Sequence, residues 1–440
     1  MIQNTAEIVI AVLSLLVLLR SLPPLARLLR DPDIRASTLA LAALIIGGVV
    51  GDMEILRGTS VFKLAYAAFF VLLMLFSLAR RRRQMAPPAS LAPVLLITLV
   101  WAWLFGVNIV QNEFFTGVGE LLMRFAPGAI WLIFLFSWKH SPVTREQLSP
   151  LAMIAVSIPG LMTPFISDAW RACDEYKCGV FDGMLKGPYI SENYLSQQVV
   201  VALLLWLFTY GLRKSLLPLL LSIAWLLATE SRTSQYTLLV ALGLALIISM
   251  VDRRRDGAPG IVGRLTLTAL ALTFFVIAFR LAMTALPTDF SGRGRIWSRA
   301  LEAVSENSIG GLGVDRWAYL QSSGLVSQLY QHSLYIFVYF GGGVIGLILL
   351  FLWVRQSLVS TAMFEKRLAP AAAFGTAFLM LGLLEVVSNP MALDGTLWIA
   401  LSLFAVPNGI LTGSTKNNRQ TTKFSDQSEH SESSEETTLR

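Results

Sequence analysis

Two arginines and one histidine are the residues of this sequence best suited to act on an anionic ligand. Arg232 stands in Ser-Arg-Thr, Arg293 in Ser-Gly-Arg, and His332 directly precedes a long apolar run. A guanidinium can bind two phosphate oxygens at once, and a neutral imidazole can accept a proton near neutral pH. The three residues could therefore hold a phosphorylated ligand and remove a proton beside it.

Other chemistries lack the residues they need. The chain has only 3 histidines and 2 cysteines, with no H-E-x-x-H, no paired C-x-x-C, no P-loop and no G-x-G-x-x-G after a strand. We therefore expect no metal and no cofactor. A Mg²⁺-dependent reaction that uses carboxylates such as Asp289, Glu302 and Asp315 stays open as an alternative.

The elements that must position these residues are membrane spans. Of the 440 residues, 55% are hydrophobic and 14% are charged, against about 25% charged in soluble domains. Apolar runs of roughly 20 residues, the length that crosses a bilayer, recur along the chain. The candidate spans are 8–28, 36–50, 59–78, 91–110, 119–138, 151–166, 193–212, 216–229, 236–251, 265–286, 333–354, 370–387 and 393–411.

This pattern predicts an all-α fold, a polytopic bundle of about 12–13 transmembrane helices. The first span is the weakest, because Arg20, Pro23 and Pro24 interrupt it; a helix lying flat on the membrane is the alternative there. A membrane domain is expected over residues 1–411. The polar tail 412–440 is expected to be disordered and cytoplasmic.

Basic clusters set the expected topology. Loops rich in Lys and Arg stay in the cytoplasm, and simple alternation of the spans brings all such clusters to one side: Arg80 to Arg83, Arg213 with Lys214, Arg253 to Arg255, and Lys366 with Arg367. The net charge of +7 thus reflects topology, and its short clusters do not indicate nucleic acid. The site would then face outward from the cytoplasmic membrane.

Two extracytoplasmic loops follow from this topology. The first, about 167–192, contains both cysteines, Cys173 and Cys178, which would form a disulfide in an oxidising compartment. The second, about 287–331, has helical periodicity after Arg293 and then a glycine turn. We expect short helices in this second loop and assign the chemistry to it.

Several charges fall inside spans, where they are costly and therefore candidates for function. Lys63, Arg124, Arg280 and Glu385 lie in the outer halves of their spans. Each cation has a simpler reading: Lys63 and Arg280 could reach the interface, and Arg124 could pair with Glu120 one turn away. Taken together, they favour an anionic ligand such as a phosphorylated lipid.

The ordered motifs resemble the O-antigen ligase and Wzy-type polysaccharide polymerase superfamily of bacterial membrane glycosyltransferases. The resemblance rests on Ser231-Arg232-Thr233, on Gly292-Arg293 before Ile296-Trp297, on Gly311 and Gly313, and on His332 before a glycine-containing apolar helix. It covers about Ser231 to Leu350. Two departures are Ser333, where the family has Asn, and the additional Arg295.

The resemblance implies transfer of a glycan from a polyprenyl diphosphate carrier to a sugar hydroxyl, without a metal. It implies that Arg232 and Arg293 act on the diphosphate and that His332 is the general base; Arg295, Arg124 and Arg280 are further diphosphate-binding candidates. The expected partners are a lipid-linked oligosaccharide, a glycan acceptor and membrane lipids. Polymerisation of repeat units is slightly favoured over ligation to a lipid core, and a lipid-linked glycan transporter is a third reading.

Overall fold

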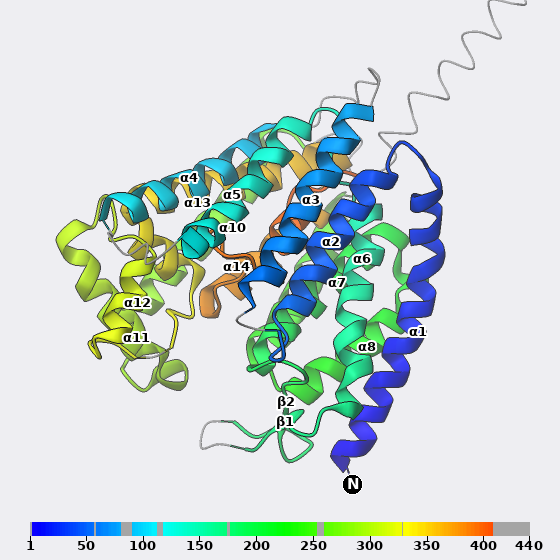
Figure 1. Ribbon diagram of the computed structural model, residues 1–440, viewed down its shortest axis with the longest axis horizontal. Coiled ribbons are helices and arrows are strands. Elements are labelled where there is room, and N and C mark those ends of the chain that lie inside the picture. The colour runs from blue at the N-terminus through cyan, green and yellow to red at the C-terminus, as the bar shows by residue number, and fades with distance from the viewer. Residues whose placement is uncertain are drawn as a thin grey trace, which may run out of the picture.

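The protein is a bundle of helices. The computed structural model describes residues 2–56, 59–80, 90–111, 118–173, 177–252, 259–327 and 329–407. Within these ranges nearly all regular structure is helical (Figure 1), so the all-α prediction is confirmed. The tail that we expected to be disordered, 412–440, lies outside the described residues.

Eight helices in the described part of the chain are long and apolar enough to cross a membrane. They are α1 (Ile2–Arg30), α3 (Ser60–Arg80), α4 (Ala92–Gln111), α5 (Val118–Ser137), α6 (Arg145–Met162), α9 (Arg232–Asp252), α10 (Ile261–Thr284) and α13 (Leu334–Glu365). Shorter apolar helices join them: α2 (Arg35–Gly51), α8 (Leu216–Thr229) and α14 (Ala369–Leu384). Helix α7 (Glu192–Tyr210) completes the bundle.

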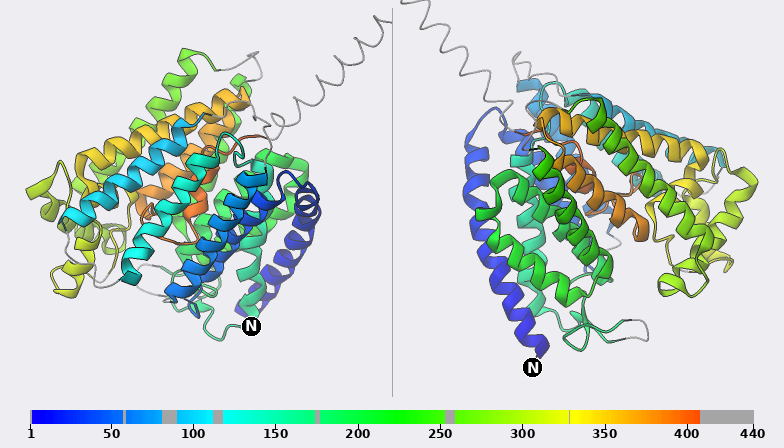
Figure 2. Two further views of the ribbon diagram at one scale, coloured as in Figure 1. Left: turned by 45° about the horizontal axis from the view of Figure 1, so that its top comes forward. Right: turned by 180° about the vertical axis from the view of Figure 1, so that it is seen from behind.

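The helices form two groups with α14 between them (Figures 1 and 2). Helix α1 packs against α6 and α8, whereas α4 packs against α5 and α13; α14 contacts α7, α9, α10 and α13. Helix α1 continues through Pro23 and Pro24 as one helix of 29 residues. Its packing along α6 favours a first span within the bundle over a helix lying flat on the membrane.

The last predicted span, 393–411, is only partly helical. Its described residues contain the six-residue helix α15 (Leu397–Ser402). At one end the Gly395 N–H donates to Asp52 beside the end of α2, and at the other the Val406 carbonyl accepts from the Arg145 N–H at the start of α6. Every residue from Leu397 to Val406 is at most 3% exposed. Non-helical backbone is tolerated at membrane depth only when protein surrounds it in this way.

A buried ion pair fixes the end of the bundle where α6 and α14 begin. Arg145, 2% exposed, pairs with Glu365 at the end of α13 and lies 4.9 Å from the centroid of the Phe374 ring. Asp252 at the end of α9 accepts hydrogen bonds from the Leu368 and Ala369 N–H groups. We call this the basal end, and the opposite end, where α7, α9 and α13 begin, the site end.

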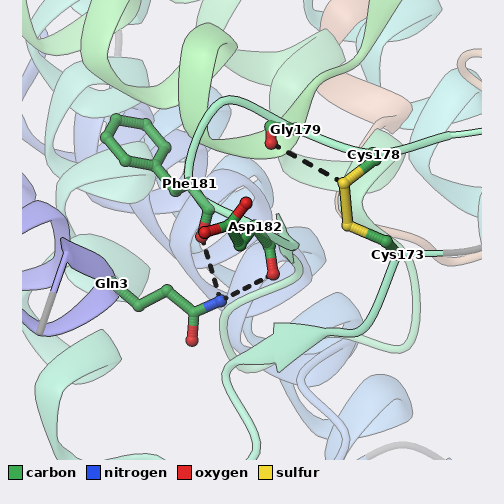
Figure 3. Close-up of a disulfide and its surroundings, with 6 residues drawn as sticks. All are labelled: Gln3, Cys173, Cys178, Gly179, Phe181 and Asp182. Carbon is green, nitrogen blue, oxygen red and sulfur yellow. Dashed lines mark hydrogen bonds between the residues drawn. A yellow bond between two sulfur atoms is a disulfide. The ribbon is translucent and has the colours of Figure 1, made fainter.

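At the site end, the α6–α7 segment folds into a small loop structure. Strands β1 (Trp170–Arg171) and β2 (Met184–Leu185) pair antiparallel, and Cys173 is joined to Cys178 by a disulfide. Figure 3 shows Gln3 of α1 beneath this loop, with its amide donating to the carbonyls of Phe181 and Asp182 at 3.1 Å. The loop is thereby attached to the first helix.

Two lysines fasten the same loop through ion pairs. Lys177 contacts Glu192, the first residue of α7, at 2.9 Å. Lys186 contacts Asp168 at 2.8 Å and Glu54, just beyond α2, at 3.4 Å. The hydrogen bond and positive charge of Lys186 lower the pKa of the Asp168 carboxyl. The loop thus connects the ends of α1, α2 and α7.

The α10–α13 segment forms a second structure at the site end, a lobe that contains α11 (Asp289–Val304), the short helix η3 (Ser305–Asn307) and α12 (Asp315–Ser322). Ile296, Trp297, Ala300 and Val304 of α11 form its buried face, together with Trp317 and Phe340. The short helices expected in this loop are therefore present, and the lobe lies beside the site end of α13 (Figure 1).

Candidate functional site

A buried glutamate at the end of α14 gathers three polar side chains. The Glu385 side chain is 11% exposed, and its Oε1 accepts from Arg293 Nη2 at 2.7 Å and from Asn193 Nδ2 at 3.1 Å. Its Oε2 lies 3.5 Å from His332 Nδ1. Four elements distant in sequence therefore meet at one carboxylate: α7, α11, the start of α13 and the end of α14.

His332 has a backbone conformation that few residues adopt. Its φ of +48° is in the left-handed region, which costs free energy for a residue with a side chain. Neighbouring contacts hold it there: Gln331 accepts at its carbonyl from Trp297 Nε1 at 2.7 Å, and the Leu334 N–H donates to the Glu385 carbonyl at 3.1 Å. The backbone on both sides of the imidazole is thus fixed.

The spacing of Arg293 and Trp297 now has a structural reason. Phe290, Ser291 and Gly292 have positive φ, so the regular turns of α11 begin at Arg293. Residues four apart lie on one face of a helix. From that face Arg293 reaches Glu385, while Trp297 reaches the backbone beside His332. One turn of helix therefore positions both the cation and the histidine.

Exposure distinguishes the members of the cluster. The side chains of Glu385 and Arg293 are 11% and 15% exposed, whereas that of His332 is 27% exposed. Because Nδ1 faces the carboxylate, Nε2 is the ring nitrogen left for a ligand. This is the arrangement in which a carboxylate orients an imidazole.

Arg232 lies at the same end, on the next helix. It is the first residue of α9, and its side chain is exposed. Ser234, two residues further along α9, donates to Ser196 at 3.0 Å, and Ser196 donates to the Asn193 carbonyl at 2.9 Å. Hydrogen bonds therefore connect the start of α9 to the segment of α7 that binds Glu385.

Of the other predicted diphosphate ligands, Arg124 has a buried partner outside the Glu385 cluster. Arg124 pairs with Asp315 of α12 at 2.5 Å, and Asn108 donates to the same carboxylate at 2.6 Å. Arg280 and Arg295 are exposed, on α10 and α11. Arg124 thus connects α5 to the lobe, in addition to any contact with Glu120.

Lys63, the remaining cation inside a predicted span, also has a partner. It contacts Asp52 at 2.5 Å, and the two side chains are 16% and 11% exposed. The expectation that Lys63 simply extends to the membrane interface is therefore incomplete, because a buried carboxylate binds its ammonium group.

The glycine motifs have a packing role. Gly311 and Gly343 both have positive φ, and a Cβ on Gly311 would lie 2.5 Å from the Gly343 nitrogen. The N–H groups of Leu312 and Gly313 donate to the carbonyls of Phe340 and Gly341 at 2.8 and 3.0 Å. The lobe is thereby docked on a break in α13, which fixes it beside His332.

The sequence marks Glu385 only as a charge inside a predicted span, and Asn193 only as the first residue of one. Neither was placed in the site. The signal for Glu385 was the free-energy cost of a charged side chain inside a membrane, because such a residue is found there with polar or charged partners. Ser333, the departure from the family pattern, donates to the Gly382 carbonyl at 3.4 Å and so contacts α14.

Comparison with known proteins supports a family for one part of the chain. Residues 217–351 match the family model described as O-antigen ligase. This segment, less than half of the chain, extends from α8 into α13 and includes Arg232, Arg293 and His332. The resemblance seen in the sequence is therefore confirmed over these residues. No curated protein matches the chain.

Proposed function

We propose that this chain, whose segment 217–351 is of the O-antigen ligase type, transfers a glycan from a polyprenyl diphosphate carrier to a sugar hydroxyl at the site end of the bundle. The family supports a membrane glycosyltransferase of the ligase or polymerase type; the carrier, the acceptor and the direction in the membrane are part of the proposal. The observation that carries it is the contact of His332 with Glu385, a carboxylate that Arg293 also binds.

In the proposed reaction, the acceptor hydroxyl lies against His332 Nε2. Its oxygen forms a bond to the anomeric carbon of the donor sugar, and the bond from that carbon to the diphosphate oxygen breaks. The electron pair of the broken bond leaves with the polyprenyl diphosphate, and the hydroxyl proton passes to Nε2. Glu385 stabilises the imidazolium that forms, as an orienting carboxylate does for a general base.

The cations have separate roles in this proposal. Arg232, exposed at the start of α9, binds the diphosphate and stabilises its growing charge. Arg293 already donates from Nη2 to Glu385 and from Nη1 to the Leu384 carbonyl, so its remaining N–H groups donate to the diphosphate while it holds the carboxylate. Arg293 thus acts on both Glu385 and the diphosphate, whereas Arg232 acts on the diphosphate alone, so the two arginines are not equivalent.

The site end is proposed to face away from the cytoplasm. Two of the basic clusters that predict a cytoplasmic side, Arg213 with Lys214 and Lys366 with Arg367, follow α7 and α13 at the basal end. The chain would then cross the cytoplasmic membrane many times. A lipid-linked donor could reach the site from the outer leaflet.

Incubation of the purified protein with polyprenyl diphosphate glycan and acceptor, in the presence of EDTA, tests the reaction. We expect release of polyprenyl diphosphate and a longer glycan. His332→Ala should reduce the rate by about 10²–10⁴-fold and leave carrier binding nearly unchanged. Wild-type turnover by that variant would remove His332 from the mechanism. Activity that EDTA abolishes and only Mg²⁺ restores would instead support a metal-dependent reaction that uses carboxylates.

Polymerisation is favoured slightly over ligation because two loop structures at the site end could receive two lipid-linked substrates. Deletion of the gene separates the two reactions. Products with a single repeat unit indicate a polymerase, whereas full-length glycan left on the carrier indicates a ligase. Movement of lipid-linked glycan across liposomes without bond formation would instead support the transporter.

A further inference from the structure

A second buried carboxylate lies beside the site and takes no part in the reaction proposed above. Asp52 follows α2 directly, and its side chain is 11% exposed. Burying a carboxylate is costly unless each oxygen has partners. Asp52 Oδ1 accepts from Lys63 Nζ, and Asp52 Oδ2 accepts from the Tyr194 hydroxyl and from the Gly395 N–H. Its hydrogen bonds therefore connect four parts of the chain.

Two of these partners belong to segments that flank Glu385. Tyr194 is the neighbour of Asn193, which donates to Glu385 Oε1. Gly395 lies ten residues after Glu385, in the segment that connects α14 to α15. The Gly395 N–H also lies 2.8 Å from the Tyr194 hydroxyl oxygen. Asp52 thus holds together the two backbone segments that approach Glu385.

Other hydrogen bonds make the α14–α15 segment compact. Ser388 has a φ of +54°, and its N–H donates to Thr396 Oγ1 at 2.9 Å. Thr396 in turn donates to Asp394 Oδ1 from its N–H at 2.9 Å and from its hydroxyl at 2.7 Å. These bonds join the beginning of the segment, three residues after Glu385, to the residues beside Gly395, where Asp52 is attached.

We infer that Asp52 is a positioning residue for Glu385, acting through Tyr194 and Gly395. This inference rests on the proposed function, because it takes Glu385 as the group that orients His332. Lys63 neutralises the buried charge, while the oxygen that accepts from Tyr194 and Gly395 sets the spacing between α7 and the α14–α15 segment. Asp52 touches no reacting atom.

Two double variants separate the accepting oxygen from the charge. In Asp52→Asn with Lys63→Met, both charges are removed but an amide oxygen remains to accept from Tyr194 and Gly395. In Asp52→Ala with Lys63→Met, the charges are removed and no acceptor remains. In neither variant is the charge of Asp52 or of Lys63 left without its partner, a change that would by itself destabilise the fold.

Hydrogen–deuterium exchange tests the attachment without reference to activity. In the alanine double variant, amides of the peptide 386–397 should exchange at least about tenfold faster. The Gly395 N–H loses its carboxylate acceptor, and the Tyr194 hydroxyl that also lies against it loses its own anchor at Asp52. In the asparagine double variant the exchange should stay near that of wild type. Equal exchange in both would overturn the inference, whether or not the protein transfers glycans.

Kinetics then test the link to the site. The alanine double variant should lose about 10²-fold in kcat with KM changed less than twofold, and the asparagine double variant should recover most of that loss. The control is Arg145→Met with Glu365→Gln, which removes a buried pair at the basal end. Equal kcat for all three folded variants would overturn the positioning role.

The two failures can be told apart. If wild type transfers no glycan but the alanine variant loosens 386–397, the proposed function fails and the attachment by Asp52 stands. If wild type is active and exchange does not change, the proposed function stands and the inference about Asp52 fails.

Discussion

The bundle contains a buried arginine–glutamate pair at each end. At the basal end, Arg145 is 2% exposed and Glu365 is 13% exposed, and the guanidinium lies over Phe374. At the site end, Arg293 is 15% exposed and shares its glutamate with Asn193 and with an imidazole that is 27% exposed. The same two residue types are thus used in different surroundings.

The difference lies in what surrounds the carboxylate. Glu365 joins α13 to α6 through the single side chain of Arg145, whereas Glu385 binds side chains of three other segments. Burial alone therefore does not identify a site. The combination of burial, several polar partners and one accessible titratable group does.

Among the variants that compare the two ends, removal of the charge of Glu385 should have the largest effect on transfer. Glu385→Gln keeps the shape of the side chain but cannot stabilise an imidazolium, and it leaves Arg293 with a weaker partner. We expect kcat to fall by about 10²–10³-fold, measured as initial release of polyprenyl diphosphate. Glu365→Gln, measured per folded molecule, is the control. Similar kcat values for the two variants would contradict the view that only the glutamate at the site end acts in transfer.

The basal pair should control stability alone. Arg145→Met leaves Glu365 unpaired in the interior, which costs about 3–5 kcal/mol, so the thermal midpoint in detergent should fall clearly. Because two of the Arg145 nitrogens have no hydrogen-bond partner among the described residues, adding Glu365→Leu should restore most of the loss. Normal stability with abolished transfer would contradict this assignment.

Arg124 tests the sequence-based view that it binds diphosphate. Its pairing with Asp315 instead indicates that it holds α12 in place. Arg124→Gln should therefore reduce transfer by about tenfold, and Arg124→Gln with Asp315→Asn should recover much of it, since no buried charge is then unpaired. If the double variant transfers glycan as slowly as the single variant and binds the carrier less tightly, Arg124 binds the diphosphate.

Arg295 should show the smallest effect. It is exposed on α11, two residues from Arg293. Arg295→Ala should change kcat/KM less than about twofold, as surface substitutions usually do, in the same assay in which Arg293→Ala is severely impaired. A large loss in both would mean that the exposed face of α11 also meets the substrate.

The sequence was sufficient for the helical class, most span positions and the common location of Arg293 and His332. These follow from local signals: apolar length, basic clusters and short motifs. The meeting of Asn193, Arg293, His332 and Glu385 could not be predicted, because it depends on how helices distant in sequence pack. The pairing of Arg124 with Asp315 was missed for the same reason, since helical spacing suggests only a partner on the same helix.

The structure of the final segment also could not be predicted from hydropathy. Residues 393–411 have the composition of a transmembrane helix, yet α15 has only six residues. The reason is that neighbouring segments satisfy its backbone: the Val406 N–H donates to the carbonyl of Val143, between α5 and α6, and Thr361 of α13 donates to the Leu403 carbonyl at 2.6 Å. Apolar composition reports burial, but it does not report whether lipid or protein surrounds the chain.

That segment has a consequence for biogenesis. Its non-helical backbone is not stable in lipid, so it can enter only after α2, α6 and α13 have formed the walls around it. Since it is also synthesised after them, its insertion closes the bundle. Nascent chains that end before residue 393 should accordingly be integrated in the membrane yet sensitive to protease at the site end, and they should become resistant only when residue 406 has emerged from the ribosome.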